Sequence, residues 1–262
     1  MSVMYCPERT RRVRGVVLIE VMIGITLGLL VLAAALGASA LAFSAAAAGS
    51  SAADLQQRAD LALALIGRQA RQAGAVQLDP AGASVVFRTS FKGWNNDGLP
   101  VSGLEGSSGR PDTLRLSRAF VDGELDCLGD MPARPGPNLP PDSVDNEYLI
   151  APETANDNRS ALYCHGNQAN NKQALISGVD DLQVLYGIAG SPGTVRYVKA
   201  GDVTAATQVL MLSVCLQLSG VGSVVAGTTA DCDGKPLPAT KTAGRMVRLA
   251  RGIFMVRNAL PA

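Results

Sequence analysis

The residues whose types and spacing most clearly suggest chemistry are Gly15, Val16 and Glu20, at the start of a long apolar run. Glu20 is the only charged residue between Gly15 and Ala53. A carboxylate inside an apolar helix is costly unless it is paired, so such residues usually have a function. Cleavage between Gly15 and Val16 would leave an amine four residues before Glu20. We therefore expect processing at this bond, and pairing of the amine with Glu20 of an axially staggered neighbouring copy.

The cysteines form a second group of reactive side chains. Cys6 precedes the cleavage site, which leaves Cys127, Cys164, Cys215 and Cys232. An even number of cysteines in an exported domain predicts disulfides, and three pairings are possible. We favour Cys127–Cys164 and Cys215–Cys232, because each pair closes a local segment rich in Pro, Gly and Asn. A zinc site is the alternative, but the chain has no CxxC spacing and only one histidine.

Catalytic and metal sites have little support in the sequence. His165 follows Cys164 and could act as a base beside a nucleophile. A disulfide followed by a surface histidine is the favoured interpretation, and the chain lacks GxSxG, P-loop and HExxH motifs. Residues 95–98 and 231–234 contain the acidic and amide side chains that calcium needs. Ordinary Asn/Asp-Gly turns explain both segments, so we expect no enzyme, no metal and no cofactor.

Five arginines in predicted strands are a possible basic strip for DNA: Arg115, Arg118, Arg245, Arg248 and Arg251. However, the chain has 23 basic and 22 acidic residues, which is not the charge balance of a nucleic-acid-binding domain. Solvated strand faces are the favoured interpretation, and nucleic acid is not an expected partner.

The apolar run at 16–48 is long enough to cross a membrane, which takes about 20 apolar residues in a helix. Four arginines precede it, at positions 9, 11, 12 and 14, and hold its start on the cytoplasmic side. We therefore expect a leader at 1–15, a membrane helix at 16–48 and a periplasmic domain at 49–262. An uncleaved signal anchor with a chance glutamate is the alternative.

The expected fold class is α+β: the membrane helix continues into an amphipathic helix at 51–74 of the periplasmic domain, so that the two form one long helix, and a β-rich part follows at 80–262. Apolar residues recur at helical spacing at Leu55, Ala59, Ala62, Ile66, Ala70 and Ala73. Strands are predicted at 84–88, 113–117, 147–151, 179–188, 194–198, 209–218 and 245–257. Exposed, turn-rich links are predicted at 89–111, 129–146 and 219–242. The helix should lay its apolar stripe on one face of an antiparallel sheet.

The basic leader, Gly15, the apolar run and Glu20 together resemble the type IV prepilin signal, here RVRG|VVLIEVMIGITLGLLVLA. The resemblance implies that a membrane peptidase cuts after Gly15 and methylates the new amine, and that the helix packs into a filament core. This chain has Val16 where the family usually has Phe, so methylation is less firmly implied than cleavage. The implied fold is pilin-like.

The segments ALALIGRQARQAGAV, RPDTLRL, ISGVDDLQVLYGI, TVRYV and MVRNAL resemble PilW-type minor pilins. This implies a low-abundance subunit that joins other minor pilins in a priming complex, helps to start the pilus and lies at its tip. Its implied partners are other minor pilins, the major pilin, the prepilin peptidase, the inner-membrane assembly machinery and membrane lipid. A J-type pseudopilin of type II secretion and a membrane-tethered enzyme or binding protein are the alternatives.

Overall fold

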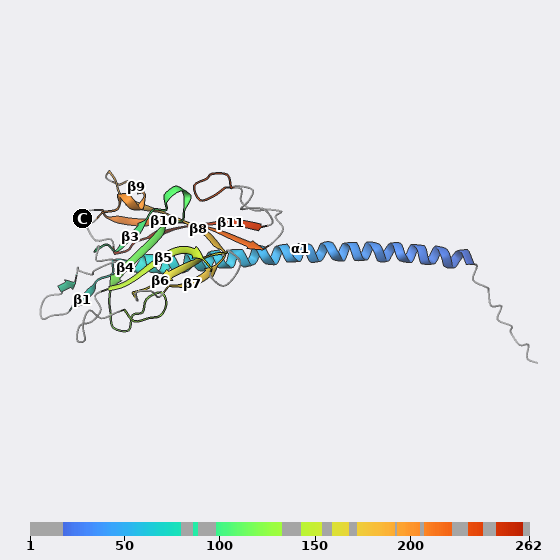
Figure 1. Ribbon diagram of the computed structural model, residues 1–262, viewed down its shortest axis with the longest axis horizontal. Coiled ribbons are helices and arrows are strands. Elements are labelled where there is room, and N and C mark those ends of the chain that lie inside the picture. The colour runs from blue at the N-terminus through green and yellow to red at the C-terminus, as the bar shows by residue number, and fades with distance from the viewer. Residues whose placement is uncertain are drawn as a thin grey trace, which may run out of the picture. The chain divides into compact units, whose positions relative to one another are not determined.

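The computed structural model describes residues 18–79, 86–88, 98–132, 143–153, 159–167, 172–191, 193–204, 207–221, 230–237 and 245–258. The chain divides into two compact units, Met1–Gly49 and Ser50–Ala262. Each unit is described by itself below, and Figure 1 labels the helix and strands. The predicted leader, with Gly15 and Val16, lies outside the described residues.

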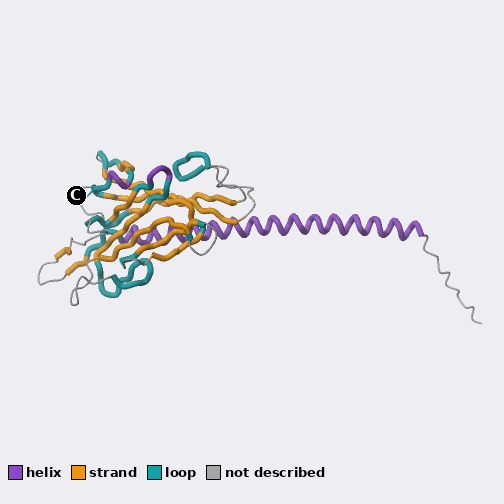
Figure 2. The backbone as a smooth tube through the Cα atoms, viewed as in Figure 1, coloured by secondary structure: helices purple, strands orange, loops and turns teal. Residues whose placement is uncertain are grey.

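Helix α1, Leu18–Gln72, contributes to both units (Figures 1 and 2). The sequence predicted one long helix with a membrane half at 16–48 and an amphipathic half at 51–74, and the structure confirms a single helix that runs without interruption through Gly49 and Ser50. Alanines flank these two weak helix formers on both sides and favour helix across them. The helix ends before Gly74, whose φ of 72° lies in the left-handed region that terminates helices. The Gly74 N–H donates to the carbonyl of Ser117 at 2.8 Å.

In the second unit, α1 buries the apolar face that its sequence spacing predicts. The six residues at helical spacing are each no more than 1% exposed: Leu55, Ala59, Ala62, Ile66, Ala70 and Ala73. Four of them are alanines, so the strands can approach the helix backbone closely. Phe254 packs its ring directly over Gly67, where an added Cβ would overlap it. This part of the helix is therefore the centre of the core of the second unit.

A five-stranded antiparallel sheet has the order β3-β4-β5-β6-β7. Its strands are β3 (Val101–Leu104), β4 (Thr113–Ala119), β5 (Ser143–Pro152), β6 (Ser160–His165) and β7 (Lys172–Ser177). Leu114, Leu116, Tyr148 and Leu162 fill its inner side and are nearly inaccessible. Burial raises the pKa of the Tyr148 hydroxyl, so this side chain stays neutral.

A four-stranded antiparallel sheet has the order β11-β10-β8-β9. Its strands are β8 (Val179–Ala189), β9 (Val195–Val198), β10 (Val209–Val221) and β11 (Arg245–Met255). Leu212, Val214, Leu216 and Leu218 alternate along β10 and are fully buried, as expected for a strand with one face on a core. A further pair, β1 (Gln77–Asp79) with β2 (Val86–Arg88), forms a separate two-stranded sheet.

The fold class is α+β, as predicted, but the strands divide between sheets rather than forming one. Most predicted strands are present with shifted ends, whereas β1, β3, β6 and β7 were missed. β3 lies within the segment 89–111 that was predicted to be an exposed link, and its Val101 is only 1% exposed. β6 and β7 are short and contain few β-branched residues. Such strands depend on pairing with their neighbours more than on intrinsic propensity.

Candidate assembly site

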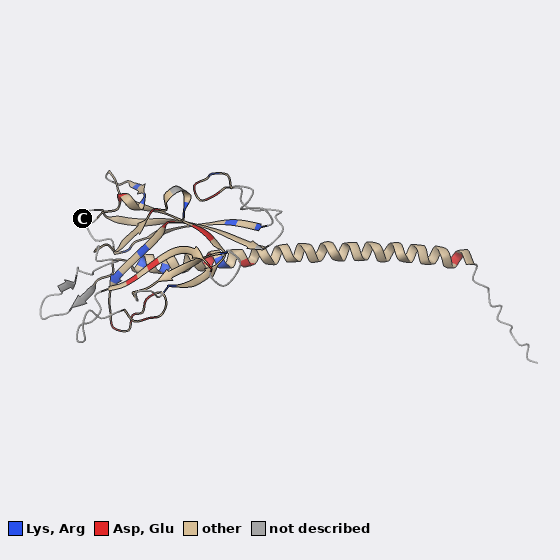
Figure 3. Ribbon diagram, viewed as in Figure 1, with Lys and Arg blue, Asp and Glu red and all other residues tan. Residues whose placement is uncertain are grey.

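Glu20 lies in the first turn of α1 and its side chain is exposed. The next charged residue along the helix is Asp54, so α1 carries no charge between these two positions (Figure 3). The hydroxyls of Thr26, Ser39 and Ser44 donate to backbone carbonyls of the preceding turn at 2.8–2.9 Å. These hydroxyls need no outside partner. Glu20 is thus the only ionisable side chain of α1 before Asp54, and it is exposed.

The large apolar side chains of Leu18–Phe43 have exposed fractions between 48% at Val21 and 78% at Leu18. They are exposed on every side of the helix, and the segment has a mean hydropathy of 2.4 over 18 residues. A helix that is apolar all round is stable only in lipid or among other helices. Length and composition both fit a single membrane span.

Both predicted cysteine pairs are joined in the structure. Cys127 and Cys164 have their Cα atoms 6.4 Å apart and connect the loop after β4 to β6. Asp126 accepts bonds from the N–H groups of Leu128, Asp130 and Asn167 and shapes this loop. Because Cys164 is joined to Cys127 in a disulfide, its sulfur is unavailable as a nucleophile for a Cys–His pair.

Cys215 and Cys232 have their Cα atoms 5.8 Å apart and connect β10 to the turn at 231–235. In that turn, Asp231 accepts bonds from the N–H groups of Asp233 and Lys235 at 3.0 and 2.8 Å. The Asp231 carboxylate thus binds the backbone of its own turn, as expected if residues 231–234 form an ordinary turn instead of a calcium site. Residues 95–97 of the other proposed turn lie outside the described part of the chain.

His165 belongs to a charged cluster on the five-stranded sheet. Its Nδ1 lies 3.5 Å from Oε2 of Glu147, and the other oxygen of Glu147 accepts a bond from Arg115 at 2.7 Å. Glu147 is largely buried between these two partners. Arg115, Glu147 and His165 thus form a cross-strand polar cluster that stabilises the pairing of β4, β5 and β6.

The five arginines considered as a DNA strip do not form one surface. Arg115 and Arg118 are on β4 and form ion pairs with Glu147 and Glu124, whereas the other three are on β11 of the other sheet. The Arg118 guanidinium also donates a hydrogen bond to Oε1 of Gln69 on α1 at 3.0 Å, and this contact fixes the helix to the sheet. These contacts give Arg115 and Arg118 structural roles.

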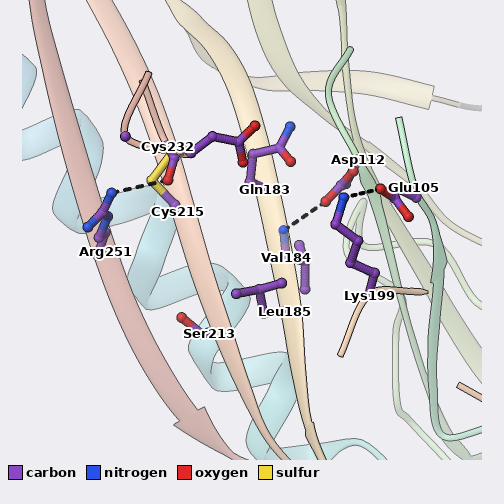
Figure 4. A pocket seen from close by; sticks show the side chains of 12 residues that line it. Glu105, Asp112, Gln183, Val184, Leu185, Lys199, Ser213, Cys215, Cys232 and Arg251 are labelled. Carbon is purple, nitrogen blue, oxygen red and sulfur yellow. Dashed lines mark hydrogen bonds and ion pairs between the residues drawn. A yellow bond between two sulfur atoms is a disulfide. The ribbon is translucent and has the colours of Figure 1, made fainter. Parts of the chain in front are cut away.

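A pocket of about 420 Å³ lies beside the outer part of β8 and β10 (Figure 4). Lys199 pairs with Glu105 on one side, and Arg251 donates to the carbonyl of Cys232 at 3.1 Å on the other. Asp112 accepts bonds from the backbone N–H groups of Gly106 and Val184. Burial raises the pKa of Asp112, and these two donors oppose that shift. Each of these charged side chains thus has a partner within the protein: Lys199 and Glu105 pair with each other, whereas Arg251 and Asp112 bind backbone groups. Sequence reasoning missed Asp112, whose only signal is its place before a predicted strand.

Comparison with known proteins adds a family match. Residues 147–258, which run from β5 to just beyond β11, match the family model of the type IV pilus-assembly protein W, PilW. Over these residues the chain is PilW-like. The match covers less than half of the chain, and it supports a PilW-type, type IV pilus-related pilin.

A type IV-like pilin from Thermus thermophilus is similar in structure, with 13% identity and a TM-score of 0.42. The superposition covers 79% of this chain and 98% of that one. No match was found among curated proteins. The PilW-type assignment therefore depends on the match over 147–258 together with the apolar segment of α1.

Proposed function

We propose that this protein is a minor pilin that takes part in the initiation and assembly of type IV pili. The observation that carries the proposal is the exposed apolar segment Leu18–Phe43 with one carboxylate at Glu20, in a chain whose C-terminal part is PilW-like. Such a segment requires lipid before assembly and neighbouring helices afterwards. A pilin subunit has both environments.

Cleavage between Gly15 and Val16 is the first step of the proposed mechanism. It removes the basic leader and creates an amine at Val16, which the peptidase methylates. The positive amine of one subunit then pairs with Glu20 of its neighbour as the helix leaves the bilayer. Because an unpaired carboxylate is costly in an apolar environment, this pair sets the axial register of the two helices.

The proposed location is the inner membrane, with a single span and a periplasmic domain, followed by the pilus, where this subunit belongs to the tip or priming complex. The two disulfides support export, because such bonds persist in oxidising compartments. Proposed partners are other minor pilins, the major pilin, the prepilin peptidase and the inner-membrane assembly machinery.

The experiment compares Glu20→Ala with the wild-type chain in piliated cells that lack the chromosomal copy. Membrane insertion and leader cleavage should survive, since the change makes the helix more apolar. Cross-links to other minor pilins and the number of surface pili should both fall at equal membrane abundance. Asp60→Ala is the matched control, because Asp60 is an exposed carboxylate on the same helix. Normal pilus numbers with Glu20→Ala would contradict the proposed role.

A further inference from the structure

Three arginines from distant parts of the chain line one pocket of about 260 Å³ in the second unit. Arg58 is on α1, Arg159 directly precedes β6, and Arg245 is the first residue of β11. The remaining lining residues are Ser51, Asp54, Gly178, Ser219 and Gly220. We propose that this arginine pocket binds the phosphate group of an anionic phospholipid at the membrane surface.

The charges of the arginine pocket favour an anion. Arg58 pairs with Asp54 at 2.8 Å and donates to the carbonyl of Ser177 at 3.3 Å, so its guanidinium is held from two sides. Among the described residues, the side chains of Arg159 and Arg245 have no ion pair or hydrogen bond. Three arginines and one carboxylate therefore line the same pocket, which leaves an excess of positive charge. Guanidinium groups bind phosphate oxygens through paired, charge-assisted hydrogen bonds.

The backbone around Gly178 holds the walls of the pocket together. Its N–H donates to Ser160, next to Arg159, at 2.9 Å, and its carbonyl accepts from Ser219 at 2.8 Å. Gly178 has a φ of 78°, and an added Cβ would lie 2.7 Å from the Ser219 carbonyl oxygen. A side chain is therefore excluded here, and the pocket stays open between the arginines.

The chain itself limits the distance from the arginine pocket to the apolar segment. Ser51, which lines the pocket, comes eight positions after Phe43 along the chain. That length is about 12 Å in a helix and at most about 29 Å fully extended. The headgroup layer of a bilayer is roughly 5–8 Å thick on each side of the hydrocarbon core. Once the apolar segment lies in a bilayer, the phosphates of that bilayer are therefore a concentrated source of anions within reach of this length of chain. This inference needs the membrane span but not the pilus function.

The test uses the full chain in nanodiscs that contain equal amounts of phosphatidylglycerol and phosphatidylcholine. The protein is extracted into neutral detergent, and the lipids that remain bound are quantified by mass spectrometry. We expect the wild type to retain phosphatidylglycerol over phosphatidylcholine, and Arg159→Gln/Arg245→Gln to reduce this preference about tenfold, because two charge-assisted contacts are lost. Arg248→Gln is the matched control, since Arg248 is exposed on β11 and does not line the pocket.

Several outcomes would overturn the proposal. Equal retention of the two lipids by the wild type would show that the pocket has no preference for an anionic headgroup. An equal loss with Arg248→Gln would show diffuse electrostatic attraction instead of a site. Displacement of the lipid by millimolar glycerol phosphate would assign the site to a soluble phosphate. Loss of subunit cross-links in the double variant, without lipid selectivity in the wild type, would assign the arginines to a protein partner. Thermal unfolding of each variant in the same detergent verifies that it is folded.

Discussion

The carboxylate of Asp112 accepts a hydrogen bond from the backbone N–H of Val184 at 2.9 Å, across the boundary between the two large sheets. The reverse contact is also present, because the Asp112 N–H donates to the carbonyl of Leu182 at 2.8 Å. Nearby, the Tyr186 hydroxyl donates to the carbonyl of Ser102 at 3.1 Å. These polar contacts fix the residue before β4 and the second residue of β3 to the middle of β8.

At acid pH, Asp112→Asn should lower the free energy of unfolding by about 1–3 kcal/mol, because an NH₂ group replaces one of the two acceptor oxygens and leaves one backbone N–H unpaired. Chemical denaturation of the full chain in detergent measures this. Asp202→Asn is the control, since Asp202 is exposed. A cost no larger than that of the control would mean that the carboxylate does not hold the two sheets together.

The wild type and the Asp112→Asn variant should also differ in how their stability depends on pH. The pKa of Asp112 is raised from its ordinary value of 3.8, mainly by burial. A raised carboxyl pKa contributes stability below the unfolded-state pKa and loses it as pH rises through the folded-state pKa. The stability of the wild type relative to Asp112→Asn should therefore be greatest at acid pH and decrease as pH rises above 3.8. A relative stability that increases with pH would contradict the raised pKa.

Gly67→Ala should destabilise the domain by about 1–3 kcal/mol, because the new methyl group overlaps the ring of Phe254. Alanine is otherwise the better helix former by about 1 kcal/mol. In a Phe254→Ala background the same change should be neutral or stabilising. A double-mutant cycle of unfolding free energies separates the two effects. If Gly67→Ala costs the same in both backgrounds, the two residues are not coupled.

The helix face and the cysteine pairs were predictable because each depends on local information. Leu55 to Ala73 repeat at helical spacing, and each cysteine pair closes a short segment. The division of the strands between two sheets was not predictable, because β8 meets the five-stranded sheet through the bonds Asp112–Val184 and Ser102–Tyr186, which join residues 72 and 84 positions apart. Arg58, Arg159 and Arg245 likewise form one pocket only through the tertiary fold. No local pattern in the sequence indicates such an arrangement.

Removal of either disulfide should destabilise the folded domain. The loops span 37 residues for Cys127–Cys164 and 17 for Cys215–Cys232. Chain-entropy estimates for loops of these lengths are about 4 and about 3 kcal/mol. Double Cys→Ser variants of each pair, compared in unfolding experiments, measure the losses. Non-reducing peptide mapping of exported protein should recover the same two pairs, and free thiols or crossed pairs would contradict the assignment.

The leader should be absent from protein isolated from peptidase-competent membranes, with Val16 as the first residue. Gly15 is the small residue before the apolar run, and a bulky replacement such as Gly15→Leu should block the cut. Mass spectrometry of the N-terminal peptide distinguishes the two forms and reports methylation of Val16. An intact N-terminus in wild-type protein would mean that the segment is an uncleaved anchor.

The proposed minor-pilin function is tested most directly by mass spectrometry of pili that have been sheared from cells and purified. We predict that the pili contain this chain at low abundance relative to the major pilin, together with other minor pilins. The chain recovered from the pili should begin at Val16. The amount in the pilus fraction should fall with Glu20→Ala but not with Asp60→Ala, at equal membrane abundance. If the wild-type chain remains in the membrane fraction and no peptide from it is found in the pili, the protein is not a subunit of the filament.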